Sequence, residues 1–136
     1  MSLRPALLAG VILATLAAAP GQALEPLSRE AYVNERLVAA RVADRIRREC
    51  PAINANMVRA FAAAQSLKAY AQRKGYAEAE IDAFLKDRAQ RQRVYAEAER
   101  YMADRGVRAG DVQSFCKLGY AEIEAGSIAG SLIRRR

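Results

Sequence analysis

The sequence contains no histidine and no tryptophan, and only two of its 136 residues are cysteine. Without histidine, the chain cannot assemble a Ser-His-Asp triad, a Cys-His dyad or a His-ligated zinc site. Two cysteines alone cannot complete a four-cysteine zinc or iron–sulfur site. The sequence therefore supports no catalytic, cofactor-binding or metal-ligating residue, and it predicts a protein that is not an enzyme.

The acidic side chains still invite an acid–base hypothesis. Three pairs of glutamates are separated by one intervening residue: Glu78 and Glu80, Glu97 and Glu99, and Glu122 and Glu124. On a helix, residues at this spacing point in nearly opposite directions, so none of these pairs forms a dyad. An enzyme built from tyrosine, arginine and carboxylate side chains on facing helices is kept as an alternative, although no residue pattern selects such a site.

Residues 1–23 have the features of a secretory signal peptide. Arg4 supplies the positive charge, an uncharged stretch rich in Leu and Ala follows, and small residues at Gly21 and Ala23 suit a signal peptidase. The apolar stretch spans about fifteen residues, whereas a membrane-spanning helix needs about twenty. We therefore predict cleavage after Ala23 and export to the periplasm, with a retained anchor as the alternative.

Residues 24–136 are long enough for one small domain, and their apolar residues recur with a helical period. β-Branched runs and two-residue hairpin turns, which would signal strands, are missing. Four helices are expected: 29–49 with Ser28 as N-cap, from Asn54 or Asn56 to Lys74, 77–104, and one that follows Asp111. This pattern predicts an all-α, four-helix bundle-like domain, with a basic tail over about the last eight residues.

Helical spacing also predicts which residues share one face of a helix and which pair on the surface. Along one side of the second helix lie Met57, Phe61, Ala64, Leu67 and Ala71. In the long third helix, Asp87 and Arg91 stand four residues apart, which favours an ion pair on its outer face.

Cys50 at the end of the first helix and Cys116 in the fourth form the expected disulfide. An exported protein with two cysteines is expected to oxidise them. The bond would close a loop of roughly 67 residues and stabilise the fold by about 4 kcal/mol in the chain-entropy treatment. A redox role is the alternative, but this pair lacks the Cys-x-x-Cys spacing of redox enzymes.

Arginine is the most visible feature of the surface, and the net charge of the chain is +7. The residues expected to contact an acidic partner or an anionic membrane are Arg41, Arg45, Arg48, Arg134, Arg135 and Arg136. A basic surface that only keeps the protein solvated is the simpler interpretation. Nucleic acid is not an expected partner. Export would separate the protein from nucleic acid, and no aromatic residues that could stack on bases alternate with the arginines.

Four segments of the chain carry a family resemblance: 24–27 (LEPL), 43–50 (ADRIRREC), 75–84 (GYAEAEIDAF) and 115–123 (FCKLGYAEI). Together they resemble a family of small exported alphaproteobacterial proteins, a domain of unknown function. The resemblance implies an exported helical domain and supplies no catalytic residue. The organisation is also similar to that of small periplasmic acid-stress chaperones, which is an analogy of architecture alone.

These observations predict a non-catalytic interaction module of the periplasm, either an accessory subunit or a chaperone-like protein, that binds an envelope protein. A membrane-surface binder acting through the arginine-rich tail is the first alternative, and an enzyme without histidine is the second. No cofactor is expected, and the sequence does not indicate an oligomeric state.

Overall fold

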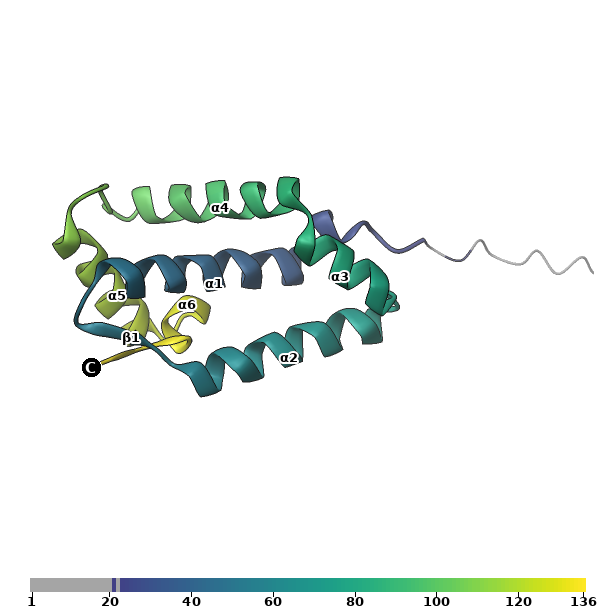
Figure 1. The fold of residues 1–136 in the computed structure, drawn as a ribbon, viewed down its shortest axis with the longest axis horizontal. Helices are drawn as coiled ribbons and strands as arrows, with labels where there is room; N and C mark the ends of the chain where they lie inside the picture. The colour runs from purple at the N-terminus through teal and green to yellow at the C-terminus, as the bar shows by residue number, and fades with distance from the viewer. Residues whose placement is uncertain (1–20, 22) are drawn as a thin grey trace, which may run out of the picture.

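The computed structural model describes residue 21 and residues 23–136, and these residues form a mainly helical fold (Figure 1). In chain order the elements are a 3-10 turn η1 (Leu27–Arg29), α1 (Ala31–Glu49), β1 (Ile53–Ala55), α2 (Met57–Lys74), α3 (Glu78–Lys86), α4 (Arg88–Ala103), α5 (Val112–Ala125), α6 (Ile128–Ser131) and β2 (Ile133–Arg135). The predicted helical, disulfide-closed fold is confirmed. The predicted signal peptide over 1–23 lies almost wholly outside the described residues.

Helix α1 is the central element of the fold. Helix α4 packs along it, α5 and α6 pack against its C-terminal part, and α2 runs on the side away from α4 (Figure 1). Helix α3 connects the ends of α2 and α4 near the beginning of α1. This arrangement places α1 between α4 and α2, and α1 is packed closely by α4, α5 and α6 but only loosely by α2.

The first helix begins two residues later than predicted, because Glu30 takes the N-cap position that the sequence assigns to Ser28. The carboxylate Oε2 of Glu30 accepts a hydrogen bond of 2.8 Å from the amide of Val33. The preceding residues are instead wound into η1, where the side chain of Asn34 donates to the carbonyl oxygens of Leu27 and Glu30. This turn uses the segment that would otherwise extend the helix.

The predicted second helix is confirmed at both ends. Of the two asparagines proposed as caps, Asn56 serves, and its Oδ1 accepts from the amide of Arg59 at 3.3 Å. Gly75 ends the helix with φ at 107°, a left-handed conformation that glycine adopts without steric cost.

The long third helix expected over 77–104 is in fact two helices, α3 and α4, that meet at Asp87. This residue is extended, with φ −65° and ψ 125°, and its Oδ1 caps α4 by accepting from the amide of Gln90 at 2.8 Å. The predicted Asp87–Arg91 ion pair is absent from the ion pairs of residues 23–136. Aspartate competes with helical geometry by accepting from nearby amides, and here capping replaces pairing.

The C-terminal residues form a helix and a strand, so the prediction of a basic tail is wrong. Strand β2 pairs antiparallel with β1, with Ile53 opposite Arg135 and Ala55 opposite Ile133. Each strand has three residues, too few to show an alternating pattern in the sequence. The last residue continues the contact, because the amide of Arg136 donates to the carbonyl of Ala52 at 3.0 Å.

The predicted disulfide is confirmed and lies in the main hydrophobic core. Cys50, at the end of α1, is bonded to Cys116 in α5, and their Cα atoms are 5.0 Å apart. The main core surrounds this bond with buried side chains from α1, α4, α5 and the two strands, among them Ile46, Met102 and Phe115. A second, smaller cluster lies near the beginning of α1. The fold is therefore packed around two centres, and the region between them holds the candidate site.

Candidate functional site: a cavity beneath helix α2

Helix α2 is held mainly near its two ends. Ala71 is its one buried residue, and it belongs to the smaller core cluster together with Leu27, Tyr76 and Ile81. At the other end, the amide of the capping Asn56 donates to the carbonyl of Leu132 at 2.8 Å. The fourteen residues before Ala71 contain no buried side chain, so α2 spans the gap between the two cores without filling it.

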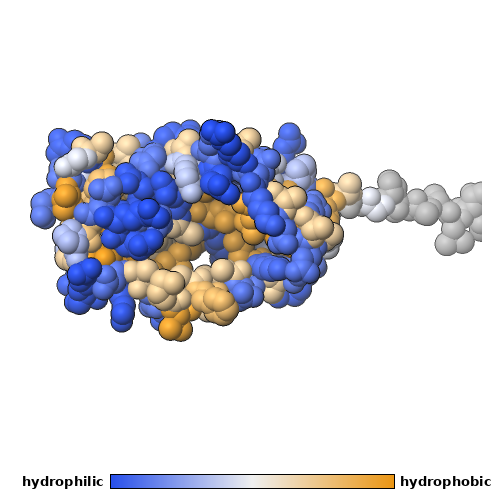
Figure 2. All heavy atoms as spheres, in the orientation of Figure 1, coloured by the Kyte–Doolittle hydropathy of each residue, from blue (hydrophilic) through white to orange (hydrophobic). Residues whose placement is uncertain are grey.

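A cavity of about 630 Å³ lies beneath this part of α2. Its walls come from α1, α2, α3 and the segment 126–133, and they are mostly apolar. Among the lining residues are Val33, Leu37, Leu67, Ile81, Phe84 and Leu132. Figure 2 shows the opening, surrounded by hydrophobic side chains. A volume of this size is typical of sites that enclose a small ligand, roughly 300–1,000 Å³.

The side of α2 that faces the cavity is only partly the one predicted. Met57, Leu67 and Ala71 line the cavity, but Phe61 does not. Phe61 is 68% exposed, beside Met57 at 70% and Val58 at 81%. The cavity-facing positions between Met57 and Leu67 are occupied by small residues such as Ala60 and Ala64. Successive residues of a helix are rotated by about 100°, so Phe61, one position after Ala60, points away from the cavity. It lies with Val58 on the outer face. Phe61 therefore does not share the cavity-facing side with Leu67 and Ala71, which corrects the predicted grouping.

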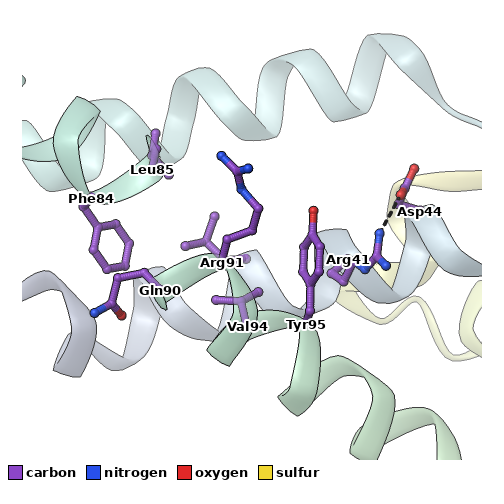
Figure 3. A pocket seen from close by; sticks show the side chains of 9 residues that line it. Arg41, Asp44, Phe84, Leu85, Gln90, Arg91, Val94 and Tyr95 are labelled. Carbon is purple, nitrogen blue, oxygen red and sulfur yellow. Dashed lines mark hydrogen bonds and ion pairs between the residues drawn. The ribbon is translucent and has the colours of Figure 1, made fainter. Parts of the chain in front are cut away.

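A smaller pocket of about 250 Å³ adjoins the cavity between α1, α3 and α4 (Figure 3). Leu37, Asp44, Phe84 and Leu85 line both spaces, so the pocket is a side compartment of the cavity. Its other lining residues are more polar: Arg41, Gln90, Arg91 and Tyr95, together with Val94. The combined site therefore has a large apolar part and a small part rich in hydrogen-bond donors.

Two guanidinium groups and one phenol line this pocket. Arg41 lies over the ring of Tyr95, with 3.9 Å from its Cζ to the ring centroid, and its Nε is buried without a hydrogen-bond partner. Arg91 forms no ion pair or side-chain hydrogen bond with any other residue of 23–136. In Figure 3 the guanidinium of Arg91 and the hydroxyl of Tyr95 point in the same direction, so both are free to meet one ligand.

Asp44 is the one carboxylate that lines either space, and it is shared by three arginines. Its oxygens lie 3.2 Å from Arg41, 2.7 Å from Arg47 and 3.0 Å from Arg48. Partial burial disfavours the charged carboxylate, but the hydrogen bonds and charges of Arg48 and Arg47 outweigh burial and lower the pKa of Asp44. The carboxylate is thus ionised and already neutralised, which leaves the site with excess positive charge.

The arginines predicted to contact a partner differ in what their side chains contact. Arg41 lines the pocket, and Arg48 pairs with Asp44. Arg45 is bonded to Glu99 at 3.0 Å and to Glu49, and these hydrogen bonds and charges raise its pKa in spite of its partial burial.

The three terminal arginines lie on and after β2, at the end of the molecule where α1 ends (Figure 1). Arg135 lies over the ring of Tyr120, 4.7 Å from its centroid. Arg136 Nε donates to Asn54 Oδ1 at 3.0 Å. Arg134 is exposed. Two of the three side chains are therefore engaged by their own chain.

Two buried carboxylates belong to separate networks. Glu30 caps α1 and accepts from the hydroxyl of Tyr70 at 2.8 Å. Glu122 in α5 accepts from the hydroxyls of Tyr101, at 2.6 Å, and Ser127. Burial and the hydrogen bond to Glu122 raise the pKa of Tyr101. Each carboxylate therefore serves as a structural acceptor, and the two do not form a like-charged pair.

Sequence reasoning missed Arg91 and Tyr95 as site residues. It assigned Arg91 to a surface ion pair and proposed no contact for Tyr95. Asp87 itself could have pointed to Arg91, since aspartate is a common N-cap residue. When its carboxylate accepts from the amide of Gln90, it no longer pairs with Arg91. The alanines on the inner face of α2 could likewise have indicated the cavity, because small side chains leave space beneath the helix.

Two general features concern the described residues as a whole. None of their helices is long and apolar enough to cross a membrane. They also contain no group of three or more His, Cys, Asp or Glu side chains arranged to hold a metal ion.

The fold and the cavity define a small helical protein, closed by one disulfide, with an apolar binding space that has a cationic side compartment. The chain belongs to a family of unknown function, DUF5333, whose model matches residues 25–134. Neither the curated proteins nor the solved structures contain a match. The disulfide is typical of proteins in an oxidising compartment.

Proposed function

We propose that this protein is a non-catalytic interaction module of the periplasm that binds another envelope protein through the outer face of α2. The observation that carries this proposal is the exposure of Val58 and Phe61 on the outer face, together with the exposed part of Met57, which also lines the cavity, on the first turns of the helix. Contiguous exposed apolar side chains commonly mark protein interaction sites. Figure 2 shows hydrophobic residues along the lower edge of the molecule, where α2 runs.

The charge of α2 indicates the chemistry of the partner. The helix contains no acidic residue, and its charged side chains are Arg59, Lys68, Arg73 and Lys74. An apolar patch on a wholly basic helix fits a partner surface in which carboxylates border apolar side chains. Such complementarity speeds encounter and selects the partner, while the apolar contact supplies most of the affinity.

The alternatives have less structural support. A membrane-binding arginine tail needs free guanidinium groups, but Arg135 and Arg136 are engaged by Tyr120 and Asn54. An enzyme without histidine needs a pair of carboxylates with a shared environment, but Glu30 and Glu122 belong to separate networks.

Site-specific photo-crosslinking in cells tests the protein partner. A photoreactive residue at Ala62, next to the patch, should capture one envelope protein, whereas the same residue at the exposed Gln72 should not. The double variant Val58→Ser with Phe61→Ser should abolish the product, and the tagged partner should capture this protein in return. Equal capture from both positions, or capture that survives the double variant, would show that the patch is not the interface.

The compartment is tested separately. The periplasmic fraction should contain a chain that begins at Leu24, as determined by amino-terminal sequencing. A chain that retains residues 1–23, or one found in the cytoplasm alone, would contradict the proposed location.

A further inference from the structure

We propose that the cavity beneath α2 is a binding site for a single-chain amphiphile with an anionic headgroup. In this arrangement the apolar chain occupies the large cavity, and the headgroup lies in the side pocket against Arg41, Arg91 and Tyr95. The inference goes beyond the protein partner proposed above, because that partner is assigned to the outer face of α2.

The lining of the cavity suits an apolar chain. The space is bounded along its length by α1 and α2, at one end by α3 with Ile81 and Phe84, and at the other by α6 and the strands with Leu132 and Ile133. An extended hydrocarbon chain matches this apolar lining.

The charges around the site select an anionic headgroup. The charged residues that line the two spaces are Arg36, Arg41, Arg47, Lys68, Arg91 and Asp44. Asp44, the single acid, already accepts from three guanidinium groups. Arg36 pairs with Glu35 and Lys68 with Glu78, so among the lining cations Arg91 is the one without an ion pair in residues 23–136. A positively charged headgroup would be repelled by Arg91, whereas a carboxylate or phosphate would pair with it.

Two exposed donor groups in the side pocket, those of Arg91 and Tyr95, are available to such a headgroup, and the buried Nε of Arg41 lies beside them without a partner. Arg91 has no ion pair within residues 23–136, the Nε of Arg41 has no acceptor, and the Tyr95 hydroxyl points the same way as Arg91 (Figure 3). Leu37, Phe84 and Leu85 line both spaces, so a headgroup held there has its chain directed into the apolar cavity. Donor groups therefore lie at the place where an amphiphile needs them.

Calorimetric titration of the purified mature chain tests this inference with named probes. Below their micelle concentrations, dodecanoate and dodecyl phosphate should bind with one-to-one stoichiometry, and the tighter of the two identifies the preferred headgroup. Dodecanol should bind at least about tenfold more weakly, and dodecyltrimethylammonium more weakly still, because neither completes the cationic pocket. Absence of dodecanoate binding, or equal affinity for the anionic and cationic probes, would overturn the proposal.

Matched variants locate the site. Arg91→Gln should weaken dodecanoate binding by about tenfold, whereas Arg88→Gln, at an exposed position outside both spaces, should leave it unchanged. Ala64→Phe, which fills the cavity, should abolish binding, whereas Ala62→Phe on the outer face should not. If the members of either pair behave alike, the site is wrongly placed. The Val58→Ser and Phe61→Ser variant should bind dodecanoate normally, so this test can fail independently of the protein interface.

Discussion

Gly130 of α6 lies directly against the carbonyl oxygen of Glu122 in α5, so closely that no side chain fits between them. A Cβ atom at position 130 would overlap that oxygen and the adjoining backbone. The same α5–α6 contact supports the segment that forms one wall of the cavity. The glycine is therefore required by the close approach of two backbones, since Gly130 does not have a positive φ.

Gly130→Ala should therefore destabilise the protein more than Gly119→Ala does. A Cβ at position 119 would meet side-chain atoms, Cδ1 of Ile53 and Cγ2 of Ile46, which the buried core can shift in part, whereas the backbone of Glu122 cannot give way. We expect a loss of about 3 kcal/mol at position 130 and about 1 kcal/mol at position 119, within the usual cost of overpacking. Urea unfolding followed by circular dichroism measures both. Equal losses would show that α6 shifts freely on α5.

Removal of the Cys50–Cys116 disulfide should lower the free energy of unfolding by about 4 kcal/mol, because the bond constrains the unfolded chain across a sequence separation of 66 residues. The double variant Cys50→Ala with Cys116→Ala avoids placing polar groups in this buried position. Reduction of the unaltered protein should give a similar loss, which separates the effect of the bond from that of the two substitutions. A loss below about 1 kcal/mol would mean that the packed core holds the two helices together unaided.

Local chemistry made much of the fold predictable from the sequence. Helix α2 begins after Asn56, whose side chain caps it, and ends at Gly75, whose backbone adopts a left-handed conformation, as predicted. The two cysteines were correctly paired because helix order places the end of α1 beside α5. These features depend on residues close in sequence, or on a covalent bond with no competing partner.

The features that were missed depend on long-range arrangement. Strands β1 and β2 are defined by a pairing across roughly eighty residues, as between Ile53 and Arg135, and leave no local pattern. The cavity exists because α2 is held at both ends, and the helical spacing of apolar residues does not reveal this. Arg91 became a site residue only because Asp87 serves as a cap. Where two local rules compete for one side chain, the sequence does not show which prevails.

Asp44→Asn should destabilise the protein at neutral pH by about 1 kcal/mol, a discounted value because Arg47 and Arg48 are substantially exposed. The pKa of Asp44 is lower in the folded protein than its ordinary value of 3.8. Its contribution is therefore fully present above about pH 4 and is lost as the pH falls through the lowered pKa of the folded state.

The difference in unfolding free energy between the unaltered protein and Asp44→Asn should accordingly shrink towards acid pH. Chemical denaturation at a series of pH values measures this. Asp82→Asn is the control, because Asp82 forms no ion pair within residues 23–136 and its substitution should leave the pH profile nearly unchanged. A difference that stays constant from pH 7 to pH 2 would show that the Asp44 charge does not stabilise the fold.

Amide hydrogen exchange should be faster in residues 58–66 of α2 than in residues 42–46 of α1. The first segment contains no buried side chain, whereas the second contains Val42, Ala43 and Ile46 in the main core. Regions with few buried apolar contacts open locally at a free energy well below that of global unfolding. We expect protection factors in α2 to be lower by about two orders of magnitude, measured by mass spectrometry of peptides after timed exchange. Saturation with dodecanoate should slow exchange in α2 and leave α1 unchanged, whereas uniform protection of both helices without ligand would mean that α2 is as firmly packed as the core.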